Sequence, residues 1–150
     1  MKPRSDYNTT APNAIKGLLE LEKYIANSNL ERSLYELVKI RASQINCCAY
    51  CLDMHTKDAR KAGETEQRIY ALNAWRETSF YTNRERAALA WTEALTLISE
   101  NDVPDSFYQS TLDYFSEEQL ITLTMAIIAI NGWNRLAISF RTEPGSYEAK

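Results

Sequence analysis

The sequence predicts an all-α fold, a compact bundle of about six to seven helices in a single domain. The 150 residues include only four Gly and four Pro, so the turns that a many-stranded sandwich or barrel needs are scarce. Apolar residues recur at helical spacing along most of the chain. Three segments also open with capping-box spacing, in which Ser or Thr is followed three residues later by Glu or Gln.

Each expected helix has its own signal in the sequence. The first, at about 11–26, has an apolar side, and the second, at about 30–45, follows the Ser28–Glu31 capping box. The third begins near Cys47 or Cys48 and ends at Gly63, a residue suited to a helix C-terminus. A short fourth helix covers about 66–75.

The second half of the chain predicts three further helices. Thr82 and Glu85 form a capping box that opens a helix through about 98, and another helix covers about 105–114. Ser116 and Gln119 open the last one, which runs to about 140 and is apolar almost all round. Such a helix is typical of the centre of a bundle.

Composition excludes several classes of function. With 17 Lys and Arg against 20 Asp and Glu, the net charge is −3, so no basic patch for nucleic acid is expected. The longest apolar run, 123–130, is shorter than the roughly 20 residues that span a bilayer. The polar N-terminus shows no signal peptide. The cysteines are clustered, not spread as in a disulfide scaffold, so we expect a cytoplasmic protein with no membrane partner.

The chemistry of this chain is expected at Cys48, Cys51 and His55. On a helix these side chains lie within an arc of roughly 60°. Thiols three residues apart can bridge, and the helix start favours a thiolate through its free N–H groups and its dipole. The only His of the chain lies one turn beyond Cys51, where it can exchange a proton with a thiol. This arrangement is typical of a dithiol redox site.

Two other interpretations of the cluster compete with this one. Buried cysteines are common in protein cores and are often inert. A structural zinc site would use Cys47, Cys48, Cys51 and His55, but four ligands on one helical turn cannot surround a tetrahedral ion. No metal and no cofactor is therefore expected. Because the chain has no nucleotide- or flavin-binding motif, its electrons must come from a separate thiol or dithiol reductant protein.

The sequence resembles the alkylhydroperoxidase D (AhpD)-like group of the carboxymuconolactone decarboxylase superfamily over about 18–141. The resemblance rests on a Glu, a CxxC twelve residues later and a His four residues after the second Cys, together with flanking segments. These segments are 37–46, 54–60, 62–66, 74–76, 84–93 and 131–135.

The resemblance implies a compact AhpD-like helical fold, homo-oligomers that are trimers or hexamers, and peroxidase or disulfide-reductase activity. It implies that Cys51 is the peroxidatic thiol and that Cys48 is the proton donor and resolving thiol. His55 and Glu36 would form a proton relay with them. From the residues alone, the helix dipole favours Cys48 as the thiolate, whereas nearness to His55 favours Cys51. From the residues alone, Glu36 would be a solvated glutamate near Lys39.

The chain departs from the family pattern at two positions. AhpD enzymes have His immediately before the second Cys, where this chain has Tyr50, a phenol of much higher pKa. Cys47 is an additional thiol where many relatives have Gly. The superfamily's decarboxylases lack the CxxC, so lactone chemistry is not expected here.

The sequence therefore predicts a thiol-dependent peroxidase that acts on a small-molecule peroxide. The alternatives are a disulfide reductase, a redox-sensing oligomer, and a structural helical oligomer whose core cysteines are inert. Several other residues that stand out in the helices are expected to have structural roles. Gly132 indicates a close backbone approach, and Arg41 is expected to pair with a carboxylate or carbonyl. The others are Trp75, Trp91, Trp133, Asn131, Asn134 and Arg135.

Overall fold

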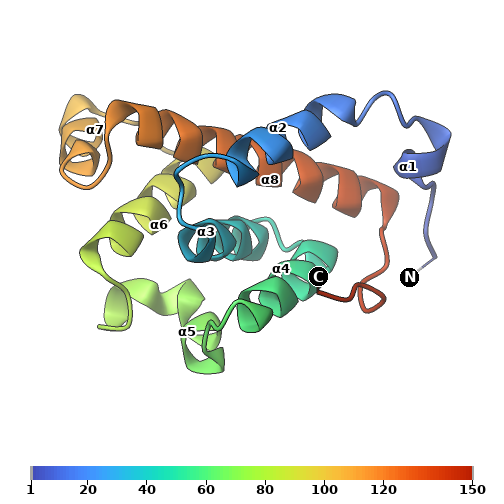
Figure 1. Cartoon of the computed structure of the whole chain (residues 1–150), viewed down its shortest axis with the longest axis horizontal. Helices are drawn as coiled ribbons and strands as arrows, with labels where there is room; N and C mark the ends of the chain where they lie inside the picture. The colour runs from blue at the N-terminus through green and yellow to red at the C-terminus, as the bar shows by residue number, and fades with distance from the viewer. Residues whose placement is uncertain (1, 150) are drawn as a thin grey trace.

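The computed structural model describes residues 2–149, and helices joined by turns and loops make up the described part of the chain, without strands (Figure 1). The helices are α1 (Tyr7–Thr10), α2 (Lys16–Ala26), α3 (Arg32–Ile45), α4 (Ala49–Lys61), α5 (Glu66–Tyr70), the 3₁₀ helix η1 (Leu72–Glu77), α6 (Asn83–Thr96), α7 (Asp105–Leu112) and α8 (Glu117–Phe140). The predicted all-α class is confirmed. The assignment of residues 1–150 to a single domain stays a prediction.

Helix α3 lies at the centre of the bundle and packs against α4, α6 and α8. Helix α2 lies along α8 across the top of Figure 1, and α4 lies below α8, toward the end where the chain finishes. The buried face of α3 includes the fully buried Leu37, Val38 and Ile40. This central position matters for function because α3 carries Glu36 and contacts the helix that carries the cysteines.

Helix α8, with 24 residues, is the one helix in the described range that is long and apolar enough to cross a membrane. In this structure it packs against α2, α3 and α6, and Leu123, Ala126 and Ile130 on its inner face are fully buried. A core helix of a bundle has the same composition, as the sequence predicted for this segment.

Two of the three predicted capping boxes are present. Thr82 and Ser116 each accept a hydrogen bond from the backbone N–H three residues later, and the side chains of Glu85 and Gln119 return the contact. The Ser28–Glu31 box was wrong. Ser28 Oγ donates instead to the carbonyl of the last turn of α2, so it closes that helix and leaves α3 to begin at residue 32 without a side-chain cap.

One predicted helix is shorter in the structure and another is divided. Within the segment predicted at 11–26, helix α2 begins only at Lys16, and Pro12 disfavours helical backbone at the residue before it. The short helix α1 lies before that segment, where no helix was predicted, and Asp6 caps it. The segment at 66–75 becomes α5 and η1. Ile69, Leu72 and Trp75 are all buried at a spacing of three, which matches the three residues per turn of a 3₁₀ helix better than the α-helical period.

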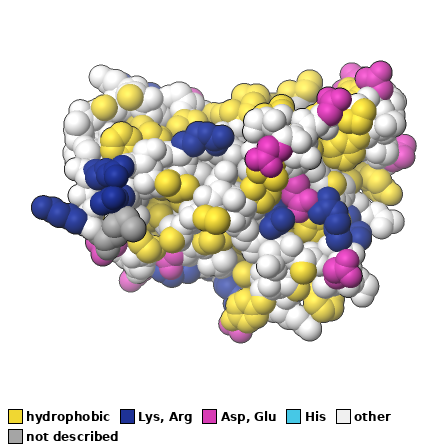
Figure 2. Space-filling model, turned by 180° about the vertical axis from the view of Figure 1, so that it is seen from behind, with side chains coloured by type: hydrophobic (Ala, Val, Ile, Leu, Met, Phe, Trp, Pro, Cys, Tyr) yellow, Lys and Arg dark blue, Asp and Glu magenta, His cyan; other side chains and the backbone are white. Residues whose placement is uncertain are grey.

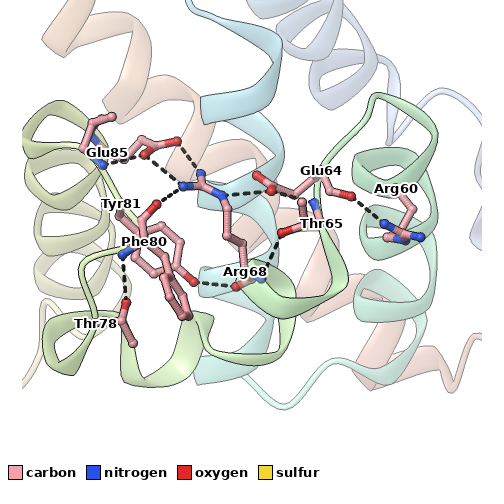
Figure 3. Close-up of polar contacts among 9 residues, drawn as sticks. Arg60, Glu64, Thr65, Arg68, Thr78, Phe80, Tyr81 and Glu85 are labelled. Atoms are coloured by element: carbon pink, nitrogen blue, oxygen red, sulfur yellow. Dashed lines mark hydrogen bonds and ion pairs between the residues drawn. The ribbon is translucent and has the colours of Figure 1, made fainter.

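A network of charged side chains holds α5 between the end of α4 and the start of α6 (Figure 3). Arg68 lies between Glu64, at 2.9 Å, and Glu85 of α6, and it also donates to the Phe80 carbonyl. The Tyr81 hydroxyl donates to the carbonyl of Arg68. These contacts fix the 78–82 turn that precedes the Thr82 cap.

Both described ends of the chain are hydrogen-bonded to helices. The Arg4 amide donates to the Phe140 carbonyl at 3.0 Å. After α8 the chain runs back beside α4, where the Gly145 amide donates to Asp53 at 2.9 Å and the Tyr147 hydroxyl donates to Asp58 at 2.8 Å. The C-terminal segment therefore lies against the helix that begins at the cysteines (Figure 1).

Candidate active site

The two cysteines of the CxxC lie at the start of α4, as the sequence predicted. Cys48 is the N-cap residue, and Cys47 before it has a left-handed backbone, with φ of 55°. The Sγ atoms of Cys48 and Cys51 are 2.9 Å apart, and both are free thiols that are almost fully buried. Cys47 is exposed. A disulfide requires about 2.05 Å between the sulfurs, so a small movement would close the bridge.

The two thiols differ in acidity. The Cys48 thiol donates to Cys51 Sγ at 2.9 Å, and once Cys48 is ionised the S–H of Cys51 can donate in return. This hydrogen bond and those from the backbone N–H groups of Cys51 and Tyr50 lower the pKa of Cys48 to about 7. The same hydrogen bond and burial raise the pKa of Cys51. In the reduced pair the thiolate therefore rests on Cys48, where the dipole argument from the sequence had placed it.

Asn134 of α8 is fully buried beside this pair. Its hydrogen bonding contributes to the lowered pKa of Cys48 and offsets part of the rise in the pKa of Cys51. The Asn134 side chain donates to Ser43 at 3.0 Å and accepts from Asn46 at 2.8 Å. Asn46 also donates to Asn131 at 2.9 Å. The prediction that Asn134 is only structural missed this contact, although a polar residue that interrupts an apolar helix was a visible signal.

Glu36 lies inside the molecule, so the solvated glutamate expected from the residues alone was wrong. Its carboxylate is 3.1 Å from His55 Nδ1 and 2.8 Å from Lys39 Nζ, and its residue is 4% exposed. Burial alone would raise the pKa of Glu36, but His55 and Lys39 together hold it below its ordinary value. Glu36 is thus an ionised, buried carboxylate that fixes the orientation of the His55 ring.

Lys39 is a residue of the site that the sequence did not single out. Its ammonium is buried with Glu36 and lies over the Tyr35 ring, 3.9 Å from the centroid. The Tyr35 hydroxyl donates to Glu22 at 2.6 Å, and Glu22 also accepts from the Trp133 indole at 3.1 Å. The i,i+3 spacing of Glu36 and Lys39 was the available signal.

Asp58 completes a cluster with Glu36 and His55, in which one ligand atom of each lies within 4.8 Å of the others. Two of these groups already have partners of their own. Lys39 is bonded to Glu36, and the Tyr147 hydroxyl donates to Asp58. A cation would have to displace the Lys39 ammonium, so this donor set suits a hydrogen-bonded relay better than a metal site.

The cysteines face two different cavities. Cys51 lines a cavity of about 350 Å³ together with His55, Lys39, Met54 and Trp133. Further wall residues of this cavity are Tyr7, Asn8, Leu19, Glu22, Tyr50, Asp58 and Ala137. Its size and largely apolar walls are typical of a site for a small organic molecule.

Cys48 lines a second cavity of about 450 Å³ with Cys47, Ile138, Arg141 and Glu143. Tyr50 belongs to the walls of both cavities, and burial raises the pKa of its phenol. The residue that stands in place of the AhpD-type His therefore borders both cavities.

The structure brings together the four residues that the sequence predicted for the site. Cys48 and Cys51 form the thiol pair, Cys51 and His55 share a cavity, and His55 contacts Glu36. On the face of the molecule drawn in Figure 2, positive and negative side chains are mixed and no histidine is visible, which agrees with the burial of His55.

Comparison with known proteins supports one family. The family model described as "Carboxymuconolactone decarboxylase family" matches residues 11–94. The uncharacterized protein YdfG of Bacillus subtilis (strain 168) is 47% identical over 146 residues, which cover 97% of this chain and 99% of YdfG.

Two solved structures share the fold. A protein of unknown function from Agrobacterium tumefaciens, ATU0492, which carries the provisional name antioxidant defence protein AhpD, has a TM-score of 0.92 and 42% identity, covering 97% of this chain and 100% of that one. The debrominase Bmp8, solved with 2,3,4-tribromopyrrole, has a TM-score of 0.78 and 21% identity, covering 91% of this chain and 73% of that one. At that identity the likeness to Bmp8 concerns the fold alone.

Proposed function

The chain belongs to the carboxymuconolactone decarboxylase family as an AhpD-like member, and from this premise we propose that it is a thiol-dependent peroxidase. The observation that carries the proposal is the pair of buried, reduced thiols 2.9 Å apart, one of which lines a cavity with His55. Members of this superfamily are enzymes with several different reactions, so the proposal rests on the site and not on the fold.

The first step uses Cys51, the thiol on the wall of the 350 Å³ cavity. Its proton passes along the short hydrogen bond to the Cys48 thiolate, and the Cys51 thiolate attacks the distal oxygen of a hydroperoxide. The O–O bond breaks, Cys51 becomes a sulfenic acid and the peroxide leaves as an alcohol. His55, held by Glu36, is placed to give the leaving oxygen its proton.

The second step closes the disulfide. The Cys48 thiol loses its proton and attacks the sulfur of the Cys51 sulfenic acid, which expels water and forms the Cys48–Cys51 bond. Cys48 suits this role because the backbone N–H groups of Cys51 and Tyr50 and the Asn134 side chain, which all lower its pKa, remain beside it when Cys51 is a sulfenic acid. A separate thiol reductant then returns two electrons and restores the dithiol.

A second candidate function is disulfide reduction without peroxide. It is favoured by the lowered pKa of Cys48 and by its place on the 450 Å³ cavity, where an external disulfide could be attacked directly. In that reaction Cys48 would be the nucleophile and Cys51 would resolve the mixed disulfide.

The deciding experiment follows the consumption of cumene hydroperoxide by the reduced protein with excess dithiothreitol. Multiple turnovers that vanish in Cys51→Ser, while circular dichroism shows an unchanged fold, would support the peroxidase. Consumption of one equivalent or none would reject it. Oxidised glutathione in place of the peroxide tests the second candidate, which predicts turnover that requires Cys48.

We also propose a homo-oligomer, a trimer or hexamer, that works in the cytoplasm with a thiol or dithiol reductant protein. Exposed apolar side chains support association, among them Ile121 and Ile128 on the outer side of α8. Light scattering behind size exclusion would give the mass, and a monomer at micromolar concentration would reject the oligomer.

A further inference from the structure

The two sulfurs of the dithiol open into different cavities, and this separation has a chemical consequence. Cys51 and not Cys48 lines the 350 Å³ cavity, whereas Cys48 and not Cys51 lines the 450 Å³ cavity. Only Tyr50 and Ala137 contribute to both walls. Each of these two cysteines is at most 2% exposed, so a reagent reaches either sulfur by way of its own cavity.

We infer that the two half-reactions use opposite sides of the dithiol, with the peroxide entering beside Cys51 and the thiol reductant entering beside Cys48. This inference rests on the proposed function, because it assigns an entrance to each of its substrates. It identifies the second cavity, bounded by Cys47, Ile138, Arg141 and Glu143, as the docking site of a thiol-bearing reductant.

The walls of the two cavities suit these different roles. The Cys51 side holds His55, which can protonate a leaving oxygen, and it includes apolar residues such as Met54 and Trp133. The Cys48 side has no acid of this kind among its wall residues, and disulfide exchange needs none when the leaving group is itself a thiolate. It is flanked by the charges of Arg141 and Glu143, which lie on the segment after α8.

The reductive step balances with a thiol reductant alone. The reductant thiolate attacks Cys48 Sγ, the Cys48–Cys51 bond breaks, and Cys51 leaves as a thiolate. A second thiol of the reductant attacks the mixed disulfide, releases Cys48 and leaves the reductant oxidised. The hydrogen bond that raises the pKa of Cys51 in the reduced pair is absent while Cys48 is in a mixed disulfide, so it does not oppose the departure of Cys51.

Two tryptophan substitutions test the separation as a matched pair. Ile138 lines the Cys48 cavity and is 48% exposed, and Leu19 lines the Cys51 cavity and is 50% exposed. Ile98 is 61% exposed and lines neither cavity, so Ile98→Trp is the control. In each case an exposed aliphatic side chain is replaced by a larger indole that can narrow an entrance.

The first readout does not depend on peroxidase activity. Cys47→Ser/Cys51→Ser leaves Cys48 as the single thiol, and Cys47→Ser/Cys48→Ser leaves Cys51, so the rate of reaction with the neutral reagent dithiodipyridine reports access to each sulfur. We expect Ile138→Trp to slow Cys48 on the order of tenfold and Leu19→Trp to slow Cys51 by a similar factor. Each substitution should leave the other thiol within about twofold, and Ile98→Trp should slow neither.

The second readout concerns the reductive step alone. Cys47→Ser protein is oxidised with diamide and then reduced by dithiothreitol, and Ile138→Trp should slow this reduction whereas Leu19→Trp should not. Equal slowing of both thiols by Ile138→Trp, or slower reduction in Leu19→Trp, would overturn the inference. If Ile138→Trp accelerates both thiols, its packing is damaged, and Glu143→Trp at the exposed rim of the same cavity decides the question in its place. A protein that passes these tests but consumes no peroxide would fail only the proposed function.

Discussion

Replacing Lys39 by Met removes the charge that faces the buried Glu36 carboxylate. The ammonium and the carboxylate are 2.8 Å apart, and both side chains are less than a tenth exposed. Loss of one partner of a buried ion pair costs about 3–5 kcal/mol, because the remaining charge stays desolvated. His55 still contacts the other carboxylate oxygen and Met keeps the apolar stem, so we expect the free energy of unfolding at pH 7 to fall by about 3 kcal/mol.

The pH dependence of this loss has a definite sign. The pKa of Glu36 in the folded protein lies below its ordinary value of 4.5, so its contribution to stability is complete at neutral pH and is lost as the pH falls through the folded value. Without Lys39 that pKa rises. Folded Lys39→Met then takes up a proton at a higher pH than the wild type, and the difference in stability between the two proteins should shrink from pH 7 to pH 5.

Urea denaturation followed by tryptophan fluorescence measures the effect at both pH values and at a fixed protein concentration. Glu36→Gln and the double variant Glu36→Gln/Lys39→Met complete a double-mutant cycle. We expect the double variant to recover most of the loss, because it leaves no unpaired charge. A Lys39→Met protein within about 1 kcal/mol of the wild type at pH 7, or a loss independent of pH, would refute the role assigned to Lys39.

Three further predictions concern the thiols and the helix caps. In Cys47→Ser protein the alkylation rate of Cys48 by iodoacetamide should rise with a midpoint near pH 7, and Cys51→Ser should move this midpoint upward, because it removes the main donor to the thiolate. Asn134→Leu should also raise the alkylation midpoint of Cys48, and an unchanged midpoint would contradict the contact between Asn134 and this thiol. The same substitution should lower the free energy of unfolding by about 1–3 kcal/mol, since Ser43 and Asn46 lose a buried partner. Ser116→Ala should cost about 1 kcal/mol in urea denaturation because α8 loses its N-cap bond, whereas the matched control Ser116→Thr keeps a capping hydroxyl and should retain most of the stability.

The parts of the fold that depend on neighbouring residues were predictable from the sequence. The capping boxes at Thr82 and Ser116 each join residues three apart, and their geometry follows from a single helical turn. The spacing of Cys48, Cys51 and His55 likewise needed only the pitch of α4. Local signals failed at Ser28, where the same side chain could close the previous helix or open the next one.

The contacts between helices could not be predicted from spacing alone. Glu36 meets His55 only because α3 packs against α4, and its burial depends on that packing and not on the pattern of α3. Asn134 reaches the thiols from α8, more than eighty residues later in the chain. The resemblance supplied Glu36 as a candidate, whereas the structure showed that Lys39 and Asn134 belong to the site. Arg41 pairs with Glu93 at 2.8 Å, and a side chain on Gly132 would meet Leu18, as expected for both positions.

The place of Asn134 on the last helix has a consequence for biosynthesis. The ribosome delivers α3 and α4 well before α8, so the nascent chain carries its cysteines without the helix that buries them and tunes their acidity. Until α8 docks, the thiols lack the cover of this helix, and Cys48 lacks the one contact from α8, that of Asn134, which lowers its pKa. The buried thiol pair is therefore completed late, in the same event that completes the hydrophobic core, and a chain that stalls before α8 would display cysteines without this cover.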